Sequence, residues 1–201
     1  MHTRAIFLKR HATTIVLKLF ERKSVDLINQ NHTEENRADL DGSPAVEKIK
    51  ELVEKAQSCF FCTAVSTAQS ATRPMTVQEV DAADNLWFSS ASDSHKNLEL
   101  ASDPPVKLYF QGSPHSGFLQ LDGHATLSTD KAKIKALWKP ILKTWFTDGE
   151  DDSRITVIKV VPSKGYYWDN KHGDAAAGVM MMLGAALCKT LDHSIEGTVR
   201  I

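Results

Sequence analysis

Apolar residues recur at helical spacing over residues 44–56, where polar and charged positions fill the intervening turns. The members of this stripe are Val46, Ile49, Leu52, Val53 and Ala56. A spacing of three and four residues places them on one face of a helix. The pattern therefore predicts an amphipathic first helix.

Shorter patterns of apolar residues fill much of the remaining chain. Residues 118–128 alternate Leu119, Leu121, Gly123, Ala125 and Leu127 with polar residues, as expected for a half-buried strand. Apolar segments bounded by turn residues predict the other strands at 60–66, 74–81, 86–90, 106–111, 155–161, 165–168 and 198–201. The polar turn at 67–72 predicts that the first two of these pair as a hairpin.

Helices are predicted between some of these strands. Residues 93–101 form a short helix that ends before Pro104 and Pro105. Residues 131–138 and 140–146 form two helical pieces with Pro140 at their junction. An apolar segment at 175–188 is too short to cross a bilayer and predicts a buried terminal helix.

The order of these elements indicates a mixed α+β fold that is mainly β. Closely spaced strands with a few inserted helices favour an antiparallel β-barrel with flanking helices. A Rossmann fold is disfavoured because no repeated βαβ unit and no Gly-x-Gly-x-x-Gly motif occurs.

The first 35 residues differ in composition from the rest of the chain. Residues 1–23 contain six Lys and Arg residues against the single acid Glu21, and a polar linker follows. We interpret residues 1–35 as a basic, flexible extension, either a loose tail or a segment that contacts an anionic surface, and residues 36–201 as the folded domain. The apolar runs near the N-terminus are interrupted by lysine and arginine, so we expect no membrane segment and a cytoplasmic protein.

Overall charge and cysteine content narrow the function classes. The net charge of −1 and the pI near 6.7 argue against a nucleic-acid partner. Three cysteines, an odd number, are typical of a reducing compartment. Cys59 and Cys62 flank two phenylalanines in a predicted strand, so we expect core residues and not a redox or metal site.

A candidate phosphate site lies where the strand at 86–90 leads into the helix at 93–101. Ser94 and Lys96 stand at the start of that helix, after the small hydroxyl residues Ser89 and Ser90. Free backbone N–H groups at a helix N-terminus, serine hydroxyls and an ammonium group together suit a phosphate dianion. The alternative is that Ser94 only caps the helix and Lys96 is solvated.

Arg73 offers a second cation beside this segment. It precedes Pro74 and Met75 at the start of a predicted neighbouring strand, from which its guanidinium can reach the same anion. The alternative is a surface arginine after a turn. Six aromatic residues are candidates to wall a flat ring or to pack in the core: Trp87, Tyr109, Trp145, Tyr166, Tyr167 and Trp168.

Taken in order, these motifs resemble bacterial general stress proteins related to pyridoxamine 5'-phosphate oxidase. The resemblance runs from about Asn36 to the C-terminus and rests on a set of short motifs: Arg73-Pro74-Met75, Leu86-Trp87-Phe88-Ser89-Ser90, Ser94-His95-Lys96-Asn97, Trp145-Phe146-x-x-Gly149-x-Asp151-Asp152 and Tyr167-Trp168-Asp169. Each motif alone is weak, and the ordered set is specific.

The resemblance implies a split β-barrel homodimer with flavin mononucleotide (FMN) in clefts between the subunits. By the same analogy Arg73, Ser94 and Lys96 would hold the phosphate, with His95 nearby as a contact or a cap. The strand backbone at Pro74-Met75 and Trp87-Phe88-Ser89-Ser90 would follow the ring and ribityl chain, and Trp145 and Trp168 would come from the second subunit. The implied function is a flavin-dependent oxidoreductase of undefined substrate.

The C-terminal sequence departs from the true oxidases. They carry an arginine-rich substrate segment there, whereas this chain ends with Arg200 alone, so oxidation of pyridoxamine phosphate is not expected. The alternatives are a flavin-binding or sequestering stress protein without turnover, or a barrel that holds haem or a deazaflavin. A hydrolase is disfavoured because no Gly-x-Ser-x-Gly occurs. The scattered His115, His124 and His172 lack metal-ligand spacing, and Asp151-Asp152 is interpreted as a turn or cap.

Overall fold

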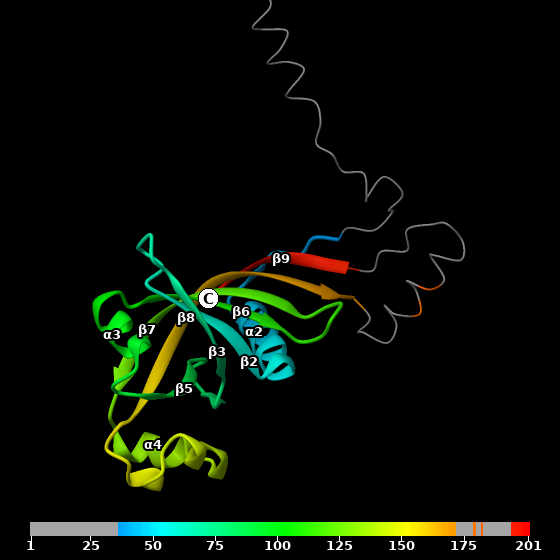
Figure 1. Cartoon of the computed structure of the whole chain (residues 1–201). Coiled ribbons are helices and arrows are strands. Elements are labelled where there is room, and N and C mark those ends of the chain that lie inside the picture. Colours follow the sequence, from blue (N-terminus) through cyan, green and yellow to red (C-terminus); the bar gives the residue numbers. More distant parts are fainter. Residues whose placement is uncertain (1–35, 172–178, 180–181, 183–193) are drawn as a thin grey trace, which may run out of the picture. The chain divides into compact units, whose positions relative to one another are not determined.

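A computed structural model describes residues 36–171, 179, 182 and 194–201 (Figure 1). The basic extension and the terminal helix expected at 175–188 lie outside the described residues, apart from positions 179 and 182. Within the described part, no helix has the length and apolar character that crossing a membrane requires.

Strands dominate the fold of the described residues, and three named α-helices accompany them there. The strands are β1 (Leu40–Asp41), β2 (Ser58–Thr63), β3 (Ala71–Thr76), β4 (Glu79–Val80), β5 (Leu86–Ala91), β6 (Pro105–Gln111), β7 (Phe118–Ser128), β8 (Ile155–Asn170) and β9 (Ser194–Arg200). The α-helices are α2 (Ser43–Ala56), α3 (His95–Ser102) and α4 (Lys131–Leu137), and η1 (Pro140–Thr144) and η2 (Gly149–Asp151) are 3-10 turns. The expected mixed, mainly β class is confirmed.

Helix α2 forms where the apolar stripe predicts it. Pro44 occupies the first turn, where a missing N–H removes no helical hydrogen bond. Ala45, Ile49, Leu52 and Val53 bury the apolar face. The helix ends at Gln57, which adopts a left-handed conformation and donates its N–H to the Val53 carbonyl at 2.8 Å.

The strands form one sheet in the order β1-β9-β8-β7-β6-β2-β3, with β5 joined to β8 and β4 joined to β5. Every named pairing except β1 with β9 is antiparallel. The hairpin of β2 and β3 is confirmed, and it places Phe61 opposite Arg73. Within the described residues no ladder joins β3 to β4 or β5, so the sheet is open there.

The sequence prediction of two strands at 155–161 and 165–168 is wrong, because β8 is continuous over both. Its first half pairs with β5 and its second half with β9, while β7 follows it along most of its length. The register shifts between Asp122 and Gly123 of β7, opposite Pro162. This irregularity accommodates a proline that cannot donate to the ladder, so the strand continues past it.

The main core lies between the sheet and α2. Phe61 and Phe88 are fully buried at its centre, with an edge-to-face contact and ring centroids 5.1 Å apart. Cys59 and Cys62 are buried free thiols, as the sequence predicts. Burial raises the pKa of Cys59 to about 12, so its thiol stays protonated and unreactive at neutral pH.

A smaller core joins α4 and η1 to the start of β8. It consists of Ile134, Leu137, Leu142, Phe146, Ile155 and Val157. Asp130 caps α4 by accepting the Ala132 N–H at 2.9 Å. The packing fixes the segment after α4, which carries Leu142, Trp145 and Phe146, beside β5.

Candidate functional site

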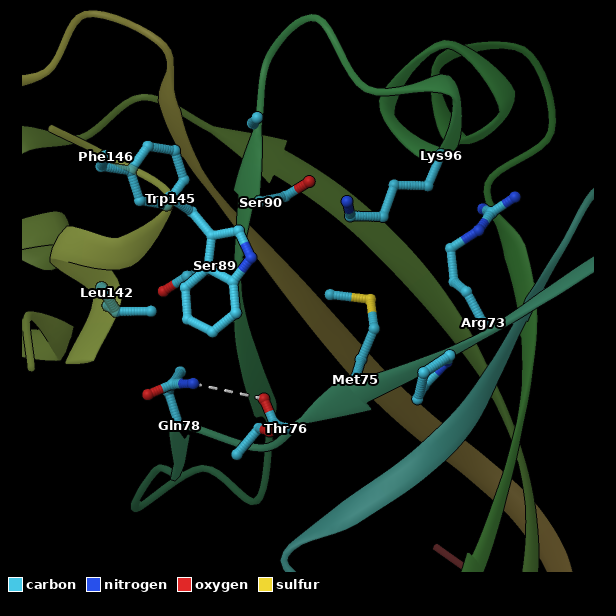
Figure 2. Close-up of a pocket in the computed structure, with 12 residues that line it drawn as sticks. Arg73, Met75, Thr76, Gln78, Ser89, Ser90, Lys96, Leu142, Trp145 and Phe146 are labelled. Carbon is cyan, nitrogen blue, oxygen red and sulfur yellow. Dashed lines mark hydrogen bonds between the residues drawn. The ribbon is translucent and has the colours of Figure 1, made fainter.

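A cavity of about 390 Å³ lies between the β3 strand, the end of β5, the start of α3 and the segment that follows α4 (Figure 2). Its volume falls within the range of small-molecule and cofactor pockets. The residues that line it are Arg73, Pro74, Met75, Thr76, Gln78, Ser89, Ser90, Ala91, Lys96, Leu142, Trp145 and Phe146.

Two cations occupy one end of this cavity. Figure 2 shows Arg73 rising from β3 and Lys96 reaching from α3, with the Lys96 ammonium directed toward Ser90. Burial, together with the neighbouring charge of Arg73, lowers the pKa of Lys96. An anion bound between the two cations would offset the cost of burying the charged Lys96 ammonium beside Arg73. The electrostatics at this end of the cavity therefore favour a negatively charged group.

The Arg73 guanidinium is held by two groups behind the cavity. Its Nη1 donates to Glu99 Oε2 at 2.8 Å and to Thr63 Oγ1 at 2.9 Å, and its Nη2 donates to Glu99 Oε1 at 3.3 Å. Thr63 also donates its hydroxyl to Glu99 Oε2. The hydrogen bond from Arg73 holds the pKa of the Glu99 carboxyl below its usual range.

A buried polar network fixes α3, and with it Lys96, against the sheet. Ser90 Oγ donates to Asn97 Oδ1 at 2.6 Å, and Asn97 Nδ2 donates to Thr156 Oγ1 at 2.8 Å. Thr156 Oγ1 in turn donates to the Ser90 carbonyl at 3.1 Å. Because the members of this network satisfy one another, it holds the helix on β5 and β8.

Apolar and hydroxyl groups make the rest of the wall. Figure 2 shows Met75 between the cations and Trp145, while Thr76 and Gln78 lie at the end away from Lys96. Trp145 is 63% exposed, so its indole face is open to a ligand. Within the described residues the Gln78 Oε1 atom is buried without a hydrogen-bond partner, which leaves an acceptor unused on this wall.

The cavity brings together seven of the twelve residues predicted from sequence. They are Arg73, Pro74, Met75, Ser89, Ser90, Lys96 and Trp145. Pairing of β5 with β8 and packing of α3 on both strands explain why Ser89 and Ser90 meet Lys96. Trp145 was expected from the second subunit, whereas it lines the cavity of its own chain. The predicted role of the seven residues in binding a cofactor stays a prediction.

The other five predicted residues lie outside the cavity wall. Phe88 is buried in the main core, and Trp87 donates its Nε1–H to Asp81 at 2.7 Å beneath the Lys133 ammonium. Ser94 precedes α3, where its hydroxyl bonds Ser90 Oγ at 3.3 Å and Asn97 Oδ1 at 3.2 Å. His95 is exposed at the first position of α3. Trp168 lies on another surface.

Sequence reasoning missed five residues of the cavity wall and both groups that hold Arg73. The wall residues are Thr76, Gln78, Ala91, Leu142 and Phe146. Phe146 directly follows the predicted site residue Trp145. Glu99 stands three positions after Lys96, so Lys96 and Glu99 lie on one side of a helix. No sequence signal marks Thr63, because its role depends on side-chain hydrogen bonds to Arg73 and Glu99 that form only when α3 packs beside the hairpin.

A second concave surface is apolar and lies on β2, β6, β7 and β8. It measures about 240 Å³, and its wall includes Phe60, Tyr109, Phe118, Tyr166 and Trp168. Phe60 is 56% exposed and Trp168 is 51% exposed. We call these five residues the aromatic face.

Metal-ligating and acidic side chains form no further candidate site in the described part of the chain. No group of three or more His, Cys, Asp or Glu residues could hold a metal ion there. Asp151 ends the η2 turn, and Asp152 follows it as its C-cap, which agrees with the predicted turn role. Asp152 pairs with Arg154 at 2.8 Å, and this contact lowers the pKa of its carboxyl.

Fold and cavity define a class of sheet-centred α+β proteins with a cavity that carries two cations at one end. Residues 44–192 match the family model described as Pyridoxamine 5'-phosphate oxidase like. The match covers well over half of the chain, so the chain belongs to that family.

Solved structures share this fold. A general stress protein 26 from Jannaschia sp. CCS1 superposes with a TM-score of 0.66 at 21% identity, over 80% of this chain and 100% of that chain. The general stress FMN/FAD binding protein from Xanthomonas citri gives a TM-score of 0.53 at 22% identity, over 62% and 87% of the two chains. At these identities the likeness shows the fold alone.

A curated relative, protein bli-3 of Neurospora crassa, is 29% identical over 91 residues. The aligned region spans 41% of this chain and 44% of that protein. The chain therefore aligns with less than half of the relative's length.

Proposed function

We propose that this chain binds FMN in the cavity beside Arg73 and Lys96, within a split β-barrel. The observation that carries the proposal is the distribution of groups along the cavity, with two cations at one end and an apolar, partly aromatic wall beyond them. Family membership and the flavin-binding description of the Xanthomonas citri relative support the same ligand.

The chemistry of the lining fits the parts of FMN. Arg73 and Lys96 would bind the phosphate, since guanidinium and ammonium groups form charge-assisted hydrogen bonds to phosphate oxygens. Ser89 and Ser90 supply polar groups beside the ribityl chain, and Met75 and Trp145 supply apolar surface for the ring. Ser94 would contribute through Ser90 and Asn97, which its hydroxyl contacts.

We further propose that the protein is a flavin-dependent oxidoreductase. No Asp, Glu or His is among the residues that line the cavity, so the described wall offers no carboxylate or imidazole for acid–base chemistry. Bound flavin supplies the electron-transfer chemistry, while the protein binds and orients it. Binding without turnover is the alternative that reduction kinetics would reveal.

The visible absorption spectrum of the purified full chain tests flavin binding. We expect a flavin band that stays with the protein through gel filtration, either as purified or after incubation with FMN, and that moves to the small-molecule fraction when the protein is denatured. Stopped-flow mixing with NADH, NADPH or a reduced deazaflavin then tests the oxidoreductase. Failure to take up FMN at any concentration would exclude the proposed ligand, and a flavin that no donor reduces would favour the non-catalytic binder.

We also propose a homodimer that uses the aromatic face. Singly exposed apolar residues are common, but a contiguous exposed cluster of aromatics is typical of an interaction surface. Light scattering of the full chain should give twice the monomer mass. A Phe60→Glu variant should give the monomer mass, because it places a charge in the cluster, whereas Leu98→Glu, at a residue 62% exposed on α3, should leave the dimer intact. A monomeric parent protein would contradict the proposal.

A further inference from the structure

Arg73 makes its hydrogen bonds from the two Nη groups of its guanidinium. Nη1 uses both hydrogens, on Thr63 Oγ1 and Glu99 Oε2, and Nη2 uses one, on Glu99 Oε1. Among the described residues nothing accepts from Nε–H or from the second Nη2–H. These two donors point the same way from the adjacent edge of the group, in the fork that matches two phosphate oxygens.

Thr63 and Glu99 come from different elements and meet only around Arg73. Thr63 is fully buried at the end of β2, and Glu99 lies in α3 one turn after Lys96. The Thr63 hydroxyl accepts from Arg73 and donates to Glu99, so the three side chains close a ring of hydrogen bonds. The guanidinium is therefore held before any ligand arrives.

We propose that Glu99 and Thr63 are positioning residues, which hold one edge of the Arg73 guanidinium so that its Nε edge is directed at the ligand phosphate. The inference rests on the proposed FMN function and assigns to this ring of hydrogen bonds the preference for a phosphorylated ligand. A long side chain that is already ordered loses less conformational entropy when the phosphate binds.

The carboxylate of Glu99 is not itself a phosphate ligand. A phosphate and the Glu99 carboxylate are both negative and repel each other. Hydrogen bonds from Arg73 and Thr63 offset this repulsion and keep the Glu99 carboxylate charged. Its negative charge also favours the protonated form of Lys96, against the opposing influence of Arg73. Loss of Glu99 would release Arg73 toward solvent and would also favour the uncharged form of Lys96.

Dissociation constants for FMN and riboflavin, measured by flavin fluorescence quenching, test the proposal. Riboflavin lacks only the phosphate, so the dissociation constant of riboflavin divided by that of FMN isolates the phosphate contribution. We expect Glu99→Gln and Thr63→Val to lower this ratio about five- to tenfold, less than the loss of a whole charge-assisted hydrogen bond because Arg73 itself stays in place, and to leave riboflavin binding within twofold. Thr63→Ser keeps the hydroxyl and should retain the parent ratio.

Asp122→Asn is the matched control, because it breaks the 2.7 Å ion pair between Lys107 and Asp122, which is outside the cavity lining. The control should leave both dissociation constants unchanged.

A merely structural role for Glu99 would weaken the binding of both flavins equally, and that result would overturn the inference. So would an unchanged ratio, or a raised one, which would make Glu99 a competitor for Arg73. If Thr63→Val does not fold, the partly exposed Glu99→Gln decides alone. A parent protein that binds riboflavin as tightly as FMN would instead refute the phosphate site itself.

Discussion

Replacement of Lys96 by alanine is expected to weaken FMN binding roughly 10- to 100-fold, the loss typical of one hydrogen bond to a charged group. The Lys96 ammonium lines the cationic end of the cavity, where burial and the neighbouring charge of Arg73 lower its pKa. Removal takes away one of two cations without emptying the core. Isothermal titration calorimetry of the flavin-free protein with FMN measures the change in dissociation constant.

Riboflavin binding provides the control for this variant and should change less than twofold. The pH dependence gives an independent check. Phosphate binding raises the pKa of Lys96, so its contribution is complete below the pKa in the free protein and is lost as the pH rises through the pKa in the complex. The riboflavin-to-FMN ratio of dissociation constants should therefore fall at alkaline pH in the parent chain and not in Lys96→Ala. Equal FMN affinity in the two proteins would remove Lys96 from the site.

Replacement of Phe61 by alanine is expected to destabilise the fold by about 3–5 kcal/mol, the usual cost of removing a buried phenylalanine. Phe61 is fully buried, and its edge-to-face contact with Phe88 joins β2 to β5. The contact connects the strand opposite Arg73 with the strand that carries Ser89 and Ser90. Urea unfolding followed by circular dichroism measures the free energy.

Leu98→Ala is the comparison for this loss, since Leu98 is 62% exposed and its truncation should cost no more than about 0.5 kcal/mol. Phe61→Ala should also lower the apparent FMN affinity, because a partly unfolded population cannot bind. Equal unfolding midpoints for Phe61→Ala and Leu98→Ala would show that the core does not depend on this aromatic pair.

Local patterns were sufficient for most elements of the fold. The helix at α2, the hairpin of β2 and β3, and the alternating strand β7 follow from apolar periodicity and turn residues, which act between near neighbours in the chain. The continuous strand β8 was not predictable in this way. Its residues near Pro162 are held in the sheet by two sets of partners and a register shift in β7, none of which is local.

The candidate site divides in the same manner. Arg73 and Lys96 were predictable as two cations of one site because each stands at a recognisable place in the sequence, a predicted strand start and a helix start, and both line the cavity. Trp168 was assigned to the cofactor by resemblance, yet in the single chain it belongs to the aromatic face. Whether a second subunit brings it to a flavin depends on the proposed dimer.

By itself, the sequence determined the succession of strands and helices, the burial of Cys59 and Cys62, and the two cations of the site. Only the tertiary structure decided what surrounds those cations. Pairing of β2 with β3 and docking of α3 through Asn97 bring Thr63 and Glu99 to Arg73. Thr63 and Glu99 are 36 positions apart in the chain. Hydrogen bonds of this kind depend on the packing of distant elements, and no periodicity along the chain encodes them.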